Sequence, residues 1–397
     1  MTTTTGRPPP WRDVRYLAWA FQLAVVGAVV VFVLWIRNNL KQRNFRIRYE
    51  YLDERSGIPI TGSDFRQTQP VGDAIIEGLA NTARLVVAGV VLATVLGTLI
   101  GIFRLSQNLI LRTAAQWYVE VVRNVPLIAI FIIMYSGVAL NYLPNPRLSL
   151  DWTPIAVANT RGVSTAWYRA DPSRYRFGGL YTFDATANWK FAMMVAAVIA
   201  AVMAVRWWRL RVGERRGGTG QAGAFSVIAA LIVIVGLSVA FGFRLTTPEL
   251  DGLRTSGGIE MTIPFFAALS ALVLYTASHV AEIVRGSIQA VAKGQGEAAD
   301  ALALSGSQRL RFVVLPQAMR IALPPIGNQY LNLAKNSSLA AVVTFPELTK
   351  ITQLLISAST VPPVASLLLL LGIYLCISLV LSIFVNLLNR RLRIVER

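Results

Sequence analysis

The chain has almost no cysteine or histidine. Cys376 is the single cysteine among 397 residues, so the chain cannot form an internal disulfide or a site built from several thiolates. His279 is the single histidine, which leaves too few ligands for the common zinc sites and only one base for a Ser-His-Asp set. We therefore expect no catalytic residue, no metal site and no cofactor.

A phosphate-binding loop is also absent. The pattern G-x-x-x-x-G-K-[ST], whose backbone N–H groups cradle nucleotide phosphates, does not occur anywhere in the chain. Any dependence on ATP must therefore come from another subunit, and we expect the chain itself not to be an enzyme.

Charged residues are scarce, and acids more so than bases. They make up 15% of the chain, against 54% hydrophobic residues, a balance that indicates an integral membrane protein. The net charge of +18 could suggest nucleic acid as a partner, but the basic residues lie between long apolar runs rather than along one face. This pattern favours the positive-inside bias of a multi-pass membrane protein and no nucleic acid.

Long apolar runs dominate the sequence. A helix needs about 20 apolar residues to cross roughly 30 Å of hydrocarbon. We therefore expect an all-α integral membrane protein with about eight transmembrane helices, near Tyr16–Ile36, Leu85–Phe103, Val125–Tyr142, Phe191–Trp208, Phe225–Phe243, Thr262–Ala281, Leu323–Phe345 and Ser366–Leu387.

Arginines set the expected orientation. They cluster after the fourth apolar segment and in the C-terminal tail, which places both on the cytoplasmic side, whereas the links after the fifth segment and before the eighth carry few basic residues. Both termini are then cytoplasmic. The first segment is too long for a cleaved signal, so we expect it to stay as an anchor helix.

A polar, helix-patterned block, Lys293–Ala318, separates two apolar segments. Its glycine and serines predict a turn between two helices, with Gly306 at the C′ position of the first helix and a serine as the next N-cap. We expect Pro316 to end the second helix. The block is too short and too polar to cross the membrane, so it is predicted to lie at the cytoplasmic surface. Its apolar face would then be available to bind a partner.

Two charge pairs have helical i,i+3 spacing, Glu120 with Arg123 and Glu282 with Arg285. Opposite charges at this spacing meet on one helix face, and each exposed pair contributes only about 0.3–0.5 kcal/mol. Their placement at the expected cytoplasmic ends of the third and sixth segments fits either anchoring of the helix ends or a role in gating.

Lys335 lies inside the seventh apolar segment, fourteen residues after Ile321 and thus roughly 20 Å further along a helix. A charge at that depth costs several kcal/mol unless it faces a polar cavity. Polar neighbours favour a broken, cavity-lining segment, in which the candidate substrate-path residues are Asn332, Lys335, Asn336, Ser337 and Ser338. Pairing of Lys335 with a carbonyl group in the packing is the alternative. His279 has the same two interpretations, structural or along a substrate path.

Several of these segments resemble permease subunits of bacterial ABC importers. The pattern Glu297-Ala298-Ala299, Gly306 and Val314-Leu315-Pro316 resembles the EAA loop of those subunits, although Ala303 stands where the family has glycine. We expect that change to be mild, because alanine is the better helix former. Further segments resemble signatures of the polar amino acid permeases (histidine/glutamine family) and, at the C-terminus, of their general L-amino-acid branch: Asn81–Leu85, Tyr118–Pro126, Ala281–Gly286, Tyr330–Leu339 and Arg391–Arg397.

The resemblance, which covers about residues 72–397, implies a type I importer permease of the bacterial inner membrane. It also implies the partners of such a subunit: a second permease, the same or related, an ATP-binding cassette ATPase, a periplasmic solute-binding protein and an L-amino acid substrate. The EAA residues Glu297, Ala298, Ala299, Gly306, Leu315 and Pro316 would then couple the permease to the ATPase. Lys335 would attract the α-carboxylate of the substrate.

The competing class is a stand-alone secondary transporter or channel. Such a protein needs intramembrane acids as ligands for its coupling ions, and apart from Glu282 near a helix end the predicted spans contain none.

The expected organisation follows from these segments. It comprises a cytoplasmic tail (1–15), a peripheral helix (16–36), a periplasmic loop (37–71), a permease domain (72–390) with a periplasmic insertion (143–190) and a cytoplasmic coupling loop (285–320), and a cytoplasmic tail (391–397). The insertion is rich in aromatic residues, which fits either a small folded elaboration or aromatic anchoring at the interface.

Overall fold

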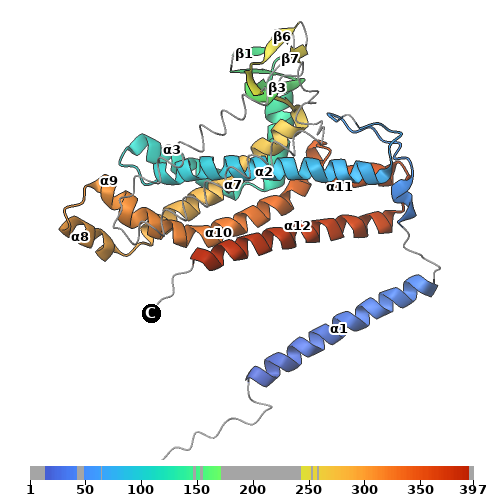
Figure 1. Cartoon of the computed structure of the whole chain (residues 1–397), viewed down its shortest axis with the longest axis horizontal. Coiled ribbons are helices and arrows are strands. Elements are labelled where there is room, and N and C mark those ends of the chain that lie inside the picture. The colour runs from blue at the N-terminus through green and yellow to red at the C-terminus, as the bar shows by residue number, and fades with distance from the viewer. Residues whose placement is uncertain are drawn as a thin grey trace, which may run out of the picture. The chain divides into compact units, whose positions relative to one another are not determined.

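The computed structural model describes residues 14–42, 49–63, 65–145, 149–152, 155–170, 243–251, 254–256 and 259–392. The chain divides into two compact units, Met1–Tyr51 and Leu52–Arg397. The first unit contains α1 (Val14–Gln42), which includes the first predicted apolar segment. The other long helices belong to the second unit (Figure 1). The fourth predicted segment, and the fifth apart from its last residue, lie outside the described residues.

Two helices, α2 (Val71–Phe103) and α7 (Ile263–Gln289), form the central pair of the second unit. Small buried residues recur every four positions on α2, at Ala93, Gly97 and Gly101. A β-carbon added at either glycine would lie 2.8 Å or closer to atoms of α7. Small residues on one helix face therefore let the two backbones approach closely, as in many membrane helix pairs.

The remaining helices surround this pair. They are α3 (Leu109–Asn124), α4 (Leu127–Ile132), the π-helix η2 (Ile133–Leu140), α10 (Leu315–Asn336), the 3-10 helix η5 (Ser337–Val343), α11 (Leu348–Ser357) and α12 (Pro363–Leu392).

Among the described residues, three helices are long and apolar enough to cross a membrane: α2, α7 and α12. Two bent pairs bring the number to five if each counts as one span. One pair bends by 107° between α3 and the α4–η2 segment, and the other by 43° between Gly306–Val343 and α11. The first bend falls at Pro126, which cannot continue a helix from the preceding residue. The mainly helical membrane fold predicted from the sequence is confirmed.

The largest described core cluster lies where α4, α7 and η5 meet. Its fully buried side chains include Phe131, Leu272 and Phe345. The rings of Phe265 and Phe345 lie 5.4 Å apart between centroids, a favourable separation for tilted aromatic pairs. The core therefore joins the start of α7 to the segment that follows α10.

Short strands, which the sequence did not predict, precede α7. A four-stranded antiparallel sheet has the order β1 (Leu150–Trp152), β2 (Ala156–Asn159), β3 (Gly162–Thr165) and β8 (Ile259–Thr262). Two further pairs join β4 (Trp167–Ala170) to β5 (Phe243–Thr246) and β6 (Glu249–Asp251) to β7 (Arg254–Ser256).

Strand β8 continues directly into α7, whose N-cap is Thr262. Figure 1 shows the strands at one end of α7 and the helices α8 (Lys293–Ala301) and α9 (Gly306–Arg309) at its other end. The described part of the predicted outer insertion is thus folded, while residues 171–190 lie outside the described residues.

Candidate functional site

The polar block Lys293–Ala318, here called the elbow, begins with α8 (Lys293–Ala301). This helix ends in a Schellman turn, in which the Leu304 N–H donates to the Ala299 carbonyl over 3.1 Å. Ala303 has a φ of 54° in that turn. Our expectation that alanine is a mild change there is wrong, because residue 303 lies outside the helix in a left-handed conformation that favours glycine.

The second helix of the elbow begins with a capping box. Ser305 is the N-cap of α9 (Gly306–Arg309), and its side chain and that of Gln308 each accept a hydrogen bond from the other residue's backbone N–H. The prediction that Gly306 occupies the C′ position of the first helix is therefore wrong. Residue 303 takes that position, and Gly306 is the first residue of the second helix.

The second helix does not end at Pro316. The π-helix η4 (Leu310–Val314) follows α9 and leads without a break into α10, with Pro316 in the first turn of α10. The π-helical turn η4 just before Pro316 marks a change in the helical hydrogen-bond pattern, and there a proline, which has no N–H to donate, is accommodated without ending the helix. The second helix of the elbow and the apolar helix α10 are therefore one continuous helical path from Gly306 to Asn336.

Polar contacts brace the elbow. The Arg309 guanidinium donates to both carboxylate oxygens of Asp300, over 2.9 and 3.1 Å, and the Gln317 amide donates to Gln295 over 3.0 Å. Together they tie α8 to α9 and to α10. Between α8 and the end of α7 lies an open cleft of about 250 Å³, lined in part by the exposed side chain of Glu297. The elbow thus presents a carboxylate at an accessible surface.

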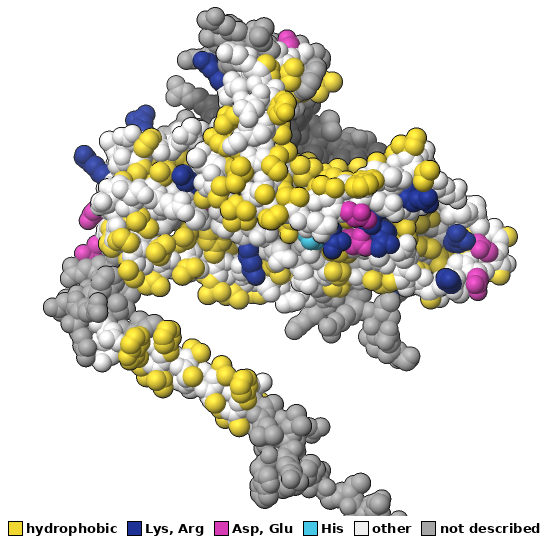
Figure 2. All heavy atoms as spheres, turned by 180° about the vertical axis from the view of Figure 1, so that it is seen from behind, with side chains coloured by type: hydrophobic (Ala, Val, Ile, Leu, Met, Phe, Trp, Pro, Cys, Tyr) yellow, Lys and Arg dark blue, Asp and Glu magenta, His cyan; other side chains and the backbone are white. Residues whose placement is uncertain are grey.

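An ion-pair cluster lies seven residues before the end of α7. The Glu282 carboxylate pairs with Arg104 and with Arg285, and Arg123 lies 3.8 Å away between Nη1 and Oε2. These arginines come from three segments, the end of α2, α3 and α7 itself. Figure 2 shows acidic and basic side chains gathered beside a histidine on a largely apolar surface. The cluster therefore connects the end of α2 to α3 and α7, at a place where charged side chains border an apolar surface.

The two predicted charge pairs differ in outcome. Glu282 and Arg285 pair as their i,i+3 spacing predicts. Among the described contacts Arg123 pairs with Glu282 and not with Glu120, whose side chain is exposed. The reason is that Glu120 lies on the exposed face of α3, while Arg123 reaches across to α7.

His279 lies one turn before this cluster. Its ring packs edge-on against Tyr275, with 4.7 Å between the centroids, and its buried Nε2 has no hydrogen-bond partner among the described residues. No group of three metal-binding side chains occurs in the described part of the chain. The contact with Tyr275 is the one that a structural histidine would make.

The predicted substrate-path residues lie where α10 breaks. The helix ends at Asn336 and the chain continues as η5, which closes on a left-handed Thr344. Lys335 is exposed, whereas Ser337 is fully buried and its hydroxyl donates to the Ala334 carbonyl over 2.7 Å. The segment Lys335–Ser338 therefore contains the change from α-helix to 3-10 helix, its side chains do not share one face, and the bend between helices comes later, after Val343.

Glu347 is a buried acid in the link between the seventh and eighth predicted apolar segments. Its side chain is fully buried between η5 and α11. Oε1 accepts the Lys350 N–H over 2.8 Å, while Oε2 accepts the Thr349 N–H over 2.9 Å and the Tyr374 hydroxyl over 2.7 Å. Glu347 lies two residues after the seventh predicted span, so the statement that the spans hold no acid besides Glu282 stands, but a buried acid lies beside them. Its position directly before the helix-forming run 348–357 was the available signal, since acids are favourable at helix starts.

Residues on α2 hold the chain on either side of Glu347. The Asn81 amide donates to the Pro346 carbonyl over 3.0 Å, and the Leu348 N–H donates to the Thr82 hydroxyl over 3.1 Å. Both side chains are buried. The Asn-Thr pair that carries part of the family resemblance therefore satisfies backbone groups that the break in the helix leaves without helical partners.

Comparison with known proteins gives matches over nearly the whole chain. The model of the binding-protein-dependent transport system inner membrane component matches residues 224–394. A putative amino-acid ABC transporter permease protein of Escherichia coli, YhdX, is 36% identical over 96% of this chain and 95% of its own length.

Two further relatives match at similar coverage. The general L-amino acid transport system permease protein AapQ of Rhizobium johnstonii is 35% identical over 97% of this chain and 94% of its own length. The glutamate/glutamine/aspartate/asparagine transport system permease protein BztB of Rhodobacter capsulatus is 32% identical over 97% of this chain and 96% of its own length.

Proposed function

Because this chain belongs to the family of amino-acid ABC transporter permeases, we propose that it is the membrane-spanning subunit of an importer for polar L-amino acids. The full-length similarity to AapQ and BztB supports a general substrate range that includes glutamate and glutamine. As a multi-pass protein of the inner membrane, it binds substrate and changes conformation, while a separate ATPase subunit hydrolyses ATP.

The observation that carries this proposal is the elbow. It joins the end of α7 to α10 through the short helices α8 and α9, and the exposed Glu297 lines its cleft. We propose that an ATPase subunit docks here, through Glu297 and its EAA neighbours. Closure of the ATPase pair on ATP then moves α7 and α10 together, and the transport path switches from outward to inward access.

The remaining partners follow from the same assignment. A second permease, the same or related, completes the transport path, and a periplasmic solute-binding protein delivers the amino acid. Both termini and the coupling loop 285–320 then face the cytoplasm. The sheet at the opposite end of α7, which combines β1 to β3 of the insertion 143–190 with β8, then faces the periplasm, and residues 72–390 form the permease domain.

The substrate contact that we propose is Lys335. Its exposed side chain lies directly before the break in α10, and an ammonium group within the membrane needs a polar or anionic partner. The α-carboxylate of an amino acid supplies one. Asn332 and Asn336 add hydrogen-bonding groups on the same turn of helix.

Co-purification tests the docking proposal. We expect Glu297→Lys to reduce the amount of ATPase that stays with the solubilised permease about tenfold, because it reverses a charge in the docking surface. The matched control is Glu260→Lys, the same change at an exposed position of β8 before the other end of α7. Equal retention of the ATPase by wild type and Glu297→Lys would contradict the proposal.

A further inference from the structure

We propose that the charge cluster around Glu282 binds the phosphate headgroup of an anionic membrane lipid. The groups that would hold it are Arg104, the C-cap of α2, Arg123 on α3 and Arg285 on α7. This ligand goes beyond the proposed function, since it is neither the transported amino acid nor the ATPase.

The cluster carries more positive than negative charge. Three guanidinium groups surround the Glu282 carboxylate. Glu120 is exposed on α3 and has no described ion pair with Arg123. Even when both acids are counted, three guanidinium groups against two carboxylates leave one positive charge in excess. Arginine stays charged in proteins, so a further anion would be attracted and would reduce the repulsion among these groups.

The described acceptors do not use all of the guanidinium donors. Arg104 and Arg285 both donate to Glu282, and Arg285 also donates to the Gln289 amide oxygen over 2.6 Å. The Nε atoms of Arg104 and Arg285 have no hydrogen-bond partner among the described residues. The described ion pair of Arg123 spans 3.8 Å, which is too long for a hydrogen bond. A phosphate would supply further acceptors, because its oxygens fit the planar fork of a guanidinium group.

Two of the three arginines can be reached from outside the described chain. The side chains of Arg123 and Arg285 are 40% and 28% exposed, whereas that of Arg104 is only 9% exposed. Figure 2 shows charged side chains open to view on this face, beside apolar ones. A phosphate can therefore contact Arg123 and Arg285 directly, while Arg104 contributes its charge from inside the cluster.

The apolar surface beside the cluster indicates a lipid rather than a free anion. The apolar helix α2 ends at the exposed Phe103, and Arg104 follows directly. Trp117 and Val121 are exposed on α3, the helix that carries Arg123. Tryptophan is favoured at the depth of lipid headgroups, and basic pockets between membrane helices bind anionic headgroups. The arginines thus suit the phosphate, and the neighbouring apolar side chains suit the acyl chains.

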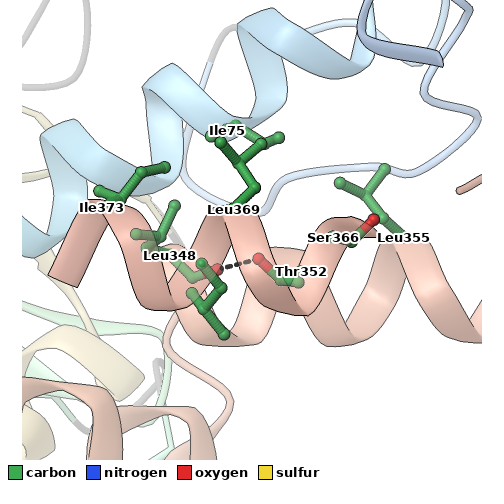
Figure 3. Close-up of a pocket in the computed structure, with 8 residues that line it drawn as sticks. Ile75, Leu348, Thr352, Leu355, Ser366, Leu369 and Ile373 are labelled. Carbon is green, nitrogen blue, oxygen red and sulfur yellow. Dashed lines mark hydrogen bonds between the residues drawn. The ribbon is translucent and has the colours of Figure 1, made fainter. Parts of the chain in front are cut away.

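Another apolar surface of the membrane region lacks this charge. Figure 3 shows a crevice between α2, α11 and α12, where Ile75, Leu355 and Ile373 are among the lining residues. None of the eight described residues that line it is charged. The crevice can pack against an acyl chain but offers no partner for a phosphate. Charge complementarity therefore favours the arginine cluster as the place of the headgroup.

Titration of the purified complex with phosphatidylglycerol tests the proposal. The permease and its partner subunits are kept in a neutral detergent, and native mass spectrometry counts the bound lipid molecules at each concentration. We expect the most tightly bound phosphatidylglycerol to have a Kd at least tenfold below that of phosphatidylcholine, which has no net charge. Equal Kd values for the two lipids on the wild-type complex would overturn the proposal without any variant.

Arg123→Gln locates the site. It removes the most exposed guanidinium group of the cluster and should raise the Kd of phosphatidylglycerol about tenfold. Arg112→Gln is the matched control, because Arg112 is exposed on the same helix, about three turns before Arg123. We expect its Kd to equal that of the wild type. Equal rises in both variants would show attraction to the general charge of α3 and would overturn the proposed site.

Two further measurements distinguish other occupants. Soluble glycerol phosphate, added at the same concentration as the lipid, should not displace it; displacement would show that a free phosphate suffices and would overturn the assignment to a lipid. The amount of second permease that stays with the complex should be the same for Arg123→Gln and the wild type. Loss of that subunit with an unchanged Kd for phosphatidylglycerol would mean that a neighbouring subunit covers the cluster, and the proposal would fail.

Discussion

The Glu282 carboxylate lies among guanidinium groups from three helical segments. It pairs with Arg104 and Arg285 and lies near Arg123, and its side chain is only 28% exposed. The three guanidinium groups repel one another. The single carboxylate therefore offsets repulsion among all three, and not only the charge of one partner. Its removal would leave partly buried guanidinium groups without their shared partner.

Glu282→Gln should lower the free energy of unfolding by about 1–3 kcal/mol, because hydrogen bonds to charged groups are lost and the arginines repel one another. Thermal unfolding of the purified complex measures it. The control is Glu120→Gln in the other i,i+3 pair, where the exposed side chain has no described ion pair with Arg123 and we expect no change. Equal effects of the two changes would refute the role given to the cluster.

Local spacing predicted part of this cluster and could not predict the rest. The i,i+3 rule brings Glu282 and Arg285 together on one helix face. Arg104 is 178 residues away in sequence, and its place depends on how α2 packs against α7. Glu347 was missed for a similar reason, since hydropathy gives no sign that a link between apolar segments folds back into the core.

At the scale of elements, the turn of the elbow carries a residue ill suited to it. Ala303 occupies the left-handed C′ position after α8, where a β-carbon is unfavourable. Glycine has no β-carbon and adopts this conformation at little cost.

Ala303→Gly should therefore stabilise the elbow by about 1 kcal/mol. Hydrogen exchange of the Leu304 amide, which is bonded across the turn, reports the local change. Ala301→Gly is the matched control: residue 301 is the last residue of α8 and still helical, so the same substitution there should destabilise by about 0.5–1 kcal/mol. If both substitutions speed exchange, the turn does not have the geometry described.

Element lengths were predictable where hydropathy alone determines them. The apolar runs predicted the apolar, membrane-spanning parts of α7 and α12. They also predicted that α2 ends at Phe103. The strands escaped prediction because they are three or four residues long, and β3 pairs with β8 across a wide separation in sequence. The continuation of the helix past Pro316 escaped prediction because a proline in a first turn is compatible with a helix. We had expected Pro316 to mark a helix end.

For the whole molecule, the elbow connects α7 to α10, and the end of α10 at Asn336 lies at the far end of that helix from the elbow. α7 leads into the elbow, and α10 leads from the elbow to Asn336, directly before the 3-10 helix η5. A displacement of the elbow therefore reaches the substrate segment through a continuous helix. In the function that we propose, this path carries energy from the ATPase to a subunit whose sequence has no phosphate-binding loop of its own.

Uptake by proteoliposomes tests that account most directly. The vesicles hold the permease, its permease partner and the ATPase, with the solute-binding protein on the substrate side, and the probes are radiolabelled L-glutamate and L-glutamine. The account predicts accumulation that requires ATP and is lost when the ATPase is omitted. Accumulation by the permease without an ATPase, driven by an ion gradient, would contradict it.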